Sequence, residues 1–243
     1  MTFERNSKLC LGLVCLFFLI VCTACGSGGS FVLSGIQSLP GWQACTGPVC
    51  AGGVGNATYA IFQGESSPSL DNNSAEFQIG GSTGFSNVKW TETLPADNSV
   101  SHFTLDLQAY LTDPGAPQSL AFGVSQIVRG VYYSFKFQCD FKGGSGVWQV
   151  WDAANQGWAP TQIACTQLPA NQWIHFIFDM ERTSSNKLHY KDFSINGTPN
   201  VLDLYFNPSA KTPDAIVIHF DEDGDASQDS YSVWLDEVTL SAS

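Results

Sequence analysis

The sequence predicts an all-β protein in which two antiparallel sheets pack face to face. Apolar and polar residues alternate with a period of two, and Gly or Pro recurs about every ten residues. Helix signals are nearly absent. This alternation is typical of sheets that bury one face, so the eleven or so strands expected here need two sheets that share a core. A closed barrel is the alternative, because it has the same alternation.

Two segments show the alternation most clearly. In the segment 101–112, every odd position from Phe103 to Leu111 is apolar, and the even positions are mostly polar. In the segment 173–181, the even positions from Ile174 to Met180 are apolar. Such a strand turns one face to a core and the other to water. Further strands are predicted at Thr58–Gln63, Ala75–Ile79, Ser119–Ser125, Val131–Gln138, Gly146–Asp152, Leu188–Ile195, Leu202–Phe206, Ala215–Phe220 and Ser232–Leu240.

The N-terminal segment differs from the rest of the chain. A polar start is followed by an apolar run from Leu9 to Val21 and by small residues before Cys25. The run is too short to span a bilayer stably, and the pattern resembles a bacterial lipoprotein signal peptide, in which Cys25 is acylated after cleavage. A plain secretory signal with an incidental Cys is the alternative. The sequence therefore predicts a signal peptide at 1–24, a flexible tether at 25–30 and one domain at 31–243.

The signal predicts an exported protein, periplasmic or on the cell surface, that acyl chains on Cys25 hold on the membrane. The full chain has 22 acidic and 10 basic residues; without Glu4, Arg5 and Lys8 it keeps 21 and 8, a net charge of −13. Such a surface repels phosphate backbones, so nucleic acid is not expected among the partners.

The predicted domain contains four cysteines, Cys45, Cys50, Cys139 and Cys165. An even number in an oxidising compartment predicts two disulfides, for which three connectivities exist. We favour Cys45–Cys50, which closes a short Thr-Gly-Pro-Val loop, and Cys139–Cys165, which would join neighbouring strands. A zinc site with four Cys ligands is the alternative, although the chain has no second closely spaced pair.

Three C-terminal stretches resemble the concanavalin A-like lectin and glucanase jelly rolls, a group that includes laminin G-like modules. They are a strand at 172–178 that opens with a Trp, a strand at 188–197 that ends in an Asn-Gly turn, and a closing strand at 232–240. The resemblance implies a jelly-roll sandwich. It does not determine the function, because one fold serves many activities.

Aromatic residues in the segment 147–158 predict a surface that binds sugars. The segment predicts a hairpin that turns at Asp152–Gly157, and its pleat puts Trp148 and Trp151 on opposite faces. An exposed ring stacks on the C–H face of a sugar, and neighbouring amides bind its hydroxyls. We predict a lectin-like site that binds glycan without cleaving it, formed by Tyr133, Trp148, Gln149, Trp151 and Trp158. The alternative is that these rings only cover the edge of the sandwich.

Two other classes of function are alternatives to glycan binding. A divergent glycosidase or polysaccharide lyase is one, although the E-x-D-x-x-E arrangement of the related glucanases is absent. A structural or adhesive envelope protein that binds another protein is the other, and it would show a large apolar surface patch. The residues that an enzyme could use are Asp179, Glu181, His175, Tyr132, Tyr133, Arg129 and Gln138.

The acidic segment 221–229 is the candidate metal site. Asp221, Asp223 and Asp225 alternate as at the start of an EF-hand loop, where carboxylates converge on calcium. Ala226 stands in place of the turn Gly, and Ser232 in place of the bidentate Glu. A solvated hairpin loop is therefore the preferred interpretation, with calcium as the alternative.

Overall fold

The computed structural model describes residues 29–144 and 146–243. The predicted signal peptide, Cys25 and most of the predicted tether lie outside the described residues. Within the described ranges, no helix is long and apolar enough to cross a membrane. A short 3₁₀ turn, η1 (Ile36–Ser38), follows the first strand.

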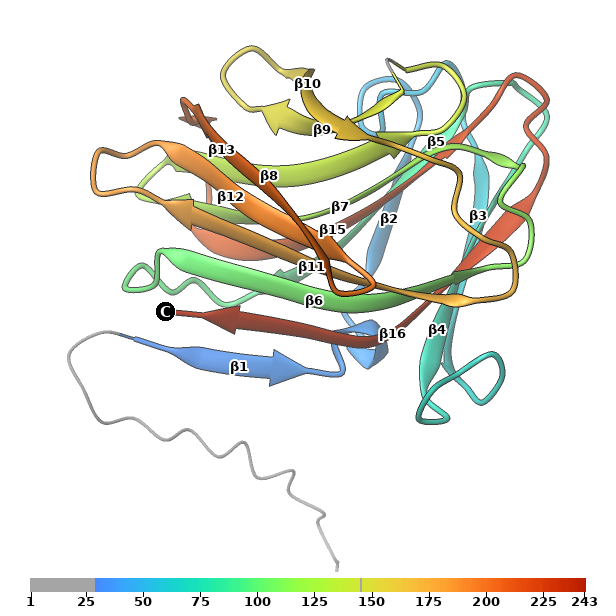
Figure 1. Cartoon of the computed structure of the whole chain (residues 1–243), viewed down its shortest axis with the longest axis horizontal. Coiled ribbons are helices and arrows are strands. Elements are labelled where there is room, and N and C mark those ends of the chain that lie inside the picture. Colours follow the sequence, from blue (N-terminus) through green and yellow to red (C-terminus); the bar gives the residue numbers. More distant parts are fainter. Residues whose placement is uncertain (1–28, 145) are drawn as a thin grey trace, which may run out of the picture.

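Two antiparallel sheets form a sandwich (Figure 1). Sheet A has the strand order β13–β12–β11–β6–β16–β4–β3, and β1 pairs with the C-terminal half of β16. Its strands are β1 (Phe31–Ser34), β3 (Thr58–Glu65), β4 (Ser74–Gly80), β6 (His102–Leu111), β11 (Trp173–Arg182), β12 (Leu188–Ile195), β13 (Thr198–Phe206) and β16 (Tyr231–Ala242).

Sheet B has the strand order β10–β9–β8–β7–β15–β5–β2, and β14 pairs with β8. Its strands are β2 (Gln43–Thr46), β5 (Asn87–Leu94), β7 (Pro117–Val128), β8 (Val131–Asp140), β9 (Val147–Asp152), β10 (Gly157–Ala164), β14 (Ser209–Ala210) and β15 (Ala215–Gly224). In Figure 1 the β9–β10 hairpin forms the upper edge of the molecule, and the C-terminus lies beside β1.

The predicted sandwich and its jelly-roll path are confirmed. The chain passes from sheet A to sheet B between β4 and β5, returns for β6 and crosses again for β7. Each predicted strand corresponds to an observed one, and β9 and β10 form the hairpin predicted to turn at Asp152–Gly157; β1, β2, β5 and β14 are additional. Strand β5 was not predicted because Glu92 lies on its inward side, in line with Val88 and Trp90. The charged residue breaks the apolar alternation by which a strand is recognised.

Aromatic rings fill much of the core between the sheets. Phe178 of sheet A lies with its ring centre 4.6 Å from that of Phe137 in sheet B, and both are fully buried. Tyr190 of β12 spans the interior, where its hydroxyl donates to the carbonyl oxygen of Trp151 at 2.8 Å. The amide of Lys136 donates to the same hydroxyl at 3.1 Å. One buried side chain of sheet A therefore fixes β8 and β9 of sheet B.

The favoured disulfide pairing is also confirmed. Cys45 pairs with Cys50, with 6.0 Å between their Cα atoms, and Cys139 pairs with Cys165, with 5.5 Å between theirs. The first bond closes the loop after β2, and the second ties the segment after β10 to β8. Two disulfides are typical of a domain that folds in an oxidising compartment, outside the cytosol.

Candidate functional site

The face of sheet B that points away from the core carries densely packed polar side chains. Strand pairing aligns Lys89 with Asp221 and, farther along the same row, Gln138 with Gln149. The next row includes His219 and Lys136, which flank Gly123 of β7. We call this surface the lysine–tyrosine face. Its polar members include Lys89, Thr91, Ser125, Tyr132, Ser134, Lys136, Gln138, Gln149, His219 and Asp221, with Asp223 and Asp140 in the row beyond Asp221 and Gln138.

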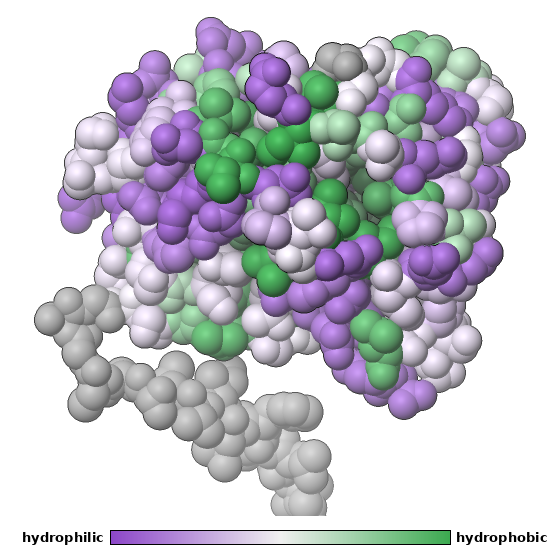
Figure 2. All heavy atoms as spheres, viewed as in Figure 1, coloured by the Kyte–Doolittle hydropathy of each residue, from purple (hydrophilic) through white to green (hydrophobic). Residues whose placement is uncertain are grey.

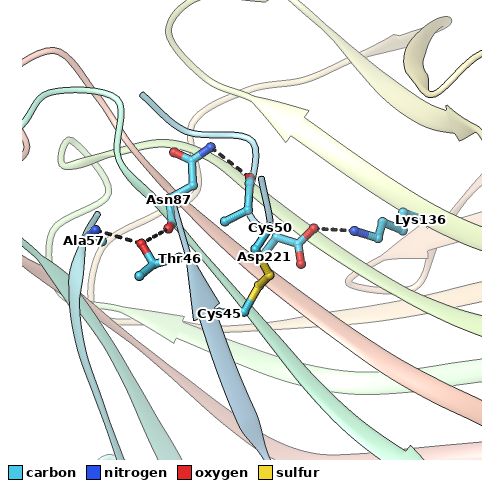
Figure 3. The surroundings of a disulfide bond; sticks show 8 residues. Cys45, Thr46, Cys50, Ala57, Asn87, Lys136 and Asp221 are labelled. Atoms are coloured by element: carbon cyan, nitrogen blue, oxygen red, sulfur yellow. Dashed lines mark hydrogen bonds and ion pairs between the residues drawn. A yellow bond between two sulfur atoms is a disulfide. The ribbon is translucent and has the colours of Figure 1, made fainter. Parts of the chain in front are cut away.

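Small residues in the central strand let side chains from both of its neighbours meet. A β-carbon on Gly123 would collide with the carbonyl oxygen of Phe135, so this outward position stays empty. Strands β8 and β15 flank β7, each about 4.8 Å away, and their long side chains can reach across it. Lys136 of β8 and Asp221 of β15 form an ion pair of 2.6 Å there, close to the Cys45–Cys50 disulfide (Figure 3).

A hydrogen-bonded chain links three strands of this face. Ser125 of β7 lies 2.7 Å from Nε2 of His219 and 3.2 Å from the hydroxyl of Tyr132. Burial, together with the charges of Lys136 and other lysines, holds the pKa of His219 well below its usual value, so the imidazole is neutral. With its proton on Nε2, neutral His219 donates to Ser125, and the Ser125 hydroxyl then donates to Tyr132.

The surroundings of Tyr132 favour its ionised form. Burial opposes ionisation, but the hydrogen bonds of Ser125 and Ser134 and the charges of Lys211 and Lys89 outweigh burial and lower the pKa of Tyr132. The Lys211 ammonium group lies 4.7 Å from the centre of the Tyr132 ring. Tyr132 is half-buried, so its hydroxyl combines a perturbed environment with some access from solvent.

Three buried polar atoms of this face have no hydrogen-bond partner among the described residues. They are Oε1 of Gln138, Nδ1 of His219 and Oδ1 of Asp221. Buried polar atoms are nearly always paired, so atoms of this kind mark places where water or a ligand completes the structure. The other two such atoms belong to Glu92 and Glu222, at inward positions of β5 and β15.

Two hollows lie on sheet A instead, one where β3, β4 and β16 come together and one on the outer face. Tyr59, Gln78 and Ser232 line the first, and Asp106 and His175 are among the residues that line the second. Among the described residues, no buried polar atom without a partner belongs to a residue that lines either hollow. The lysine–tyrosine face is therefore the stronger candidate for a functional site.

The structure separates the five residues of the predicted sugar site. Gln149 and Trp151 occupy outward positions of β9, and Trp158 of β10 pairs with Trp151, with 5.3 Å between ring centres. Trp148 is 3% exposed and Tyr133 is 2% exposed, and both pack in the core. The prediction was wrong for these two, because strand alternation turns each of them inward while its neighbour turns outward.

The enzyme candidates lie on different surfaces. Asp179 and His175 are on the outer face of sheet A, where Asp179 pairs with His102 at 2.9 Å and His175 pairs with Asp106 at 2.7 Å. Glu181 follows on the same face of β11, next to His102 in the strand register. Tyr132 and Gln138 lie on the lysine–tyrosine face, and Arg129 lies in the turn between β7 and β8. The fold therefore does not bring the enzyme candidates together in one site.

The acidic segment does not gather its carboxylates. Strand β15 continues to Gly224, so the aspartates that precede it are spaced along an extended chain, about 6.6 Å apart. Asp221 pairs with Lys136, Asp223 accepts from Ser119, and Asp225 pairs with Lys142. Within the described ranges, no group of three or more His, Cys, Asp or Glu is placed to hold a metal ion. The calcium alternative therefore finds no ligand set among the described residues, and the preferred hairpin loop is shorter than predicted, because β15 extends through Asp221 and Asp223 to Gly224.

Sequence reasoning missed most of the lysine–tyrosine face. Lys136 lies two residues before Gln138, and His219 lies two residues before Asp221, so each pair shares one side of its strand. That periodicity was a usable signal for a polar outward face. The strand register that brings these residues together is not visible in the sequence, since β8, β15 and β5 are neighbours or near neighbours only in the folded sheet.

Comparison with known proteins identifies the fold but no family. No family model and no curated protein sequence matches the chain. Among solved structures, the cellulose-induced protein Cip1 is similar with a TM-score of 0.50 and 14% identity, over 82% of this chain and 90% of that one. An alginate lyase, Aly36B, in complex with alginate trisaccharide has a TM-score of 0.47 and 11% identity, over 74% of this chain and 86% of that one.

A family 11 carbohydrate-binding module from Clostridium thermocellum, in complex with a mixed-linked tetrasaccharide, has a TM-score of 0.42 and 13% identity, over 88% of this chain and 96% of that one. Another similar structure concerns carbohydrate-binding modules of the β-sandwich superfamily; this chain covers 57% of it. At 14% identity, the likeness to Cip1 establishes a shared fold and nothing about the ligand.

Proposed function

We propose that the domain binds a carbohydrate on the lysine–tyrosine face. The observation that carries the proposal is that half-buried aromatic and amide side chains lie on the same face as buried acceptor atoms that have no partner among the described residues. Trp151 and Trp158 offer ring faces next to Gln149, and Gln138 pairs with Gln149 in the register while keeping its own Oε1 unpartnered. Rings that stack on C–H groups, with amides that bind hydroxyls, are the elements of a sugar site.

The direct test is a glycan array probed with the purified chain and with Trp151→Ala. Loss of one stacking ring should weaken binding about tenfold or more, because aromatic contacts dominate such interfaces. The matched control is Trp173→Ala, which removes a half-buried Trp from the outer face of sheet A. No binding to plant, algal or bacterial polysaccharides, or equal loss in both variants, would contradict the proposal.

A lyase is the second candidate, favoured by the chain from His219 through Ser125 to Tyr132. The lowered pKa of Tyr132 favours its phenolate, and a phenolate held in this hydrogen-bonded chain is suited to take a proton from a bound sugar and become the phenol. Release of unsaturated oligosaccharides from an acidic polysaccharide, and its loss in Tyr132→Phe, would establish the activity. Binding without any product would leave the domain as a binding module.

A structural or adhesive role has less support. In the view of Figure 2, hydrophobic residues form small groups that hydrophilic residues separate, and no broad apolar patch covers that side. Capture of a specific protein partner, together with an empty glycan array, would favour this role instead.

We also propose that the domain is exported and anchored through Cys25. The support is the lipoprotein-like N-terminal pattern, together with two disulfides in the domain. Labelling of expressing cells with a fatty acid should mark the wild-type chain, and Cys25→Ser should abolish the label. An unlabelled wild-type chain that leaves the cell would instead indicate a plain secretory signal.

A further inference from the structure

Basic residues are scarce in this protein, yet three of them gather on one surface. The whole chain carries 22 acidic and 10 basic side chains. Lys89 of β5 and Lys136 of β8 lie on the lysine–tyrosine face, and Lys211, which follows β14, covers the Tyr132 ring beside it. A cluster of lysines on an acidic protein produces a local field opposite in sign to that of the rest of the surface.

Two of these three lysines form no ion pair within the described residues. Lys136 pairs with Asp221 at 2.6 Å, but neither Lys89 nor Lys211 has an ion-pair partner in the part of the chain that the structure describes. Burial and the neighbouring Lys136 both lower the pKa of Lys89, and Asp221 only partly opposes them. The three lysines therefore gather around Asp221, with Asp223 two residues farther along the same side of β15, and Lys89 and Lys211 stay without an ion pair among the described residues.

The unsatisfied groups of this surface are placed to bind a polar ligand beside those charges. Lys89 neighbours Asp221 in the strand register, and Oδ1 of Asp221 is buried without a partner. His219, one row away, has an unpartnered Nδ1 among the described residues, and burial together with the charges of the same lysines lowers its pKa and keeps it neutral. A ligand with hydroxyls for the buried acceptors and anionic groups for Lys89 and Lys211 would complete both sets.

We propose that the ligand of the lysine–tyrosine face is an anionic polysaccharide, whose carboxylate or sulfate groups bind Lys89 and Lys211. This inference rests on the proposed function and adds the charge of the ligand. The neutral aromatic end, at Trp151 and Trp158, then contacts sugar rings, while the lysine end contacts the charged substituents. Lys136 has a structural part, because its ion pair with Asp221 holds the middle of the face.

The test compares polymers that differ in charge and share a backbone. Isothermal titration of the purified chain should show binding to polygalacturonate and at least tenfold weaker binding to its carboxyl-reduced, neutral form. A sulfated galactan in a third titration distinguishes sulfate from carboxylate as the preferred group. Binding to the preferred polymer should weaken as salt is raised, because exposed lysines are screened.

Substitutions of Lys211 and Lys89 test their assigned role in binding the anionic groups. Lys211→Gln changes an exposed side chain and should leave the fold intact, and together with Lys89→Gln it should weaken polyanion binding at least tenfold. Lys187→Gln, an exposed lysine in the turn before β12, is the matched control and should have no effect. Equal affinity for the acidic and neutral polymers, or an unchanged double variant, overturns the charge inference and leaves glycan binding standing. No binding to any polymer overturns both.

Discussion

Replacing Glu222 with Gln should make the domain less sensitive to rising pH. Glu222 is fully buried at an inward position of β15, where its Oε2 accepts a hydrogen bond of 2.8 Å from the Trp90 indole and its Oε1 has no partner among the described residues. Burial raises the pKa of Glu222 to about 8, against the smaller opposing effect of the Trp90 hydrogen bond, and the negative charges of Asp223 and Glu76 add to the increase.

The sign of the effect follows from proton binding. Below pH 4.5, the ordinary value for this group, both the folded and the unfolded chain hold the proton. Between pH 4.5 and about 8 only the folded chain holds it, so the free energy of unfolding falls as pH rises. At 1.36 kcal/mol for each pH unit, the loss from Glu222 alone is about 3 kcal/mol between pH 4.5 and pH 7.

Urea unfolding, followed by Trp fluorescence at several pH values, would measure this loss in the wild type, in Glu222→Gln and in the control Glu237→Gln. Gln carries no proton equilibrium, so the difference in unfolding free energy between Glu222→Gln and wild type should grow by about 3 kcal/mol in favour of the variant from pH 4.5 to pH 7. The exposed Glu237 should show no such growth. Parallel curves for wild type and Glu222→Gln would refute the reasoning.

Other variants test the packing that supports the candidate site. Tyr190→Phe removes the hydroxyl that joins sheet A to the backbone of Trp151. The variant should therefore lose about 1–3 kcal/mol of unfolding free energy and bind glycan more weakly. Unchanged glycan binding would indicate that Trp151 is not part of the site. Phe178→Ala should cost about 3–5 kcal/mol, since the side chain is fully buried among other rings; a loss below 1 kcal/mol would contradict the packing. Removing the Cys139–Cys165 bond, whose cysteines are 26 residues apart, should lower the unfolding free energy by about 3–4 kcal/mol. Removing Cys45–Cys50 should lower it by only roughly 2 kcal/mol, because the closed loop is shorter. Thermal melts of the two variants would measure both losses, and the reverse order would argue against loop entropy as the cause.

Local patterns predicted much of the fold correctly. The alternation in β6 and β11 was sufficient to assign both strands and their buried faces, because side-chain direction in a strand depends only on position. The same rule correctly separated Trp148 from Trp151, but it could not say which of the two faces the core. That choice depends on which side of sheet B meets sheet A, and Trp148 proved to be the inward one.

The sequence by itself determined an all-β chain and the alternation of its strands, since these depend on period and composition, and it favoured one of three disulfide connectivities. Only the tertiary structure decided which polar side chains share a surface. Lys89, Lys136 and His219 come from β5, β8 and β15, and they meet because the strand order of sheet B and its register bring distant segments together. Register follows from the packing of both whole sheets, and no single segment encodes it.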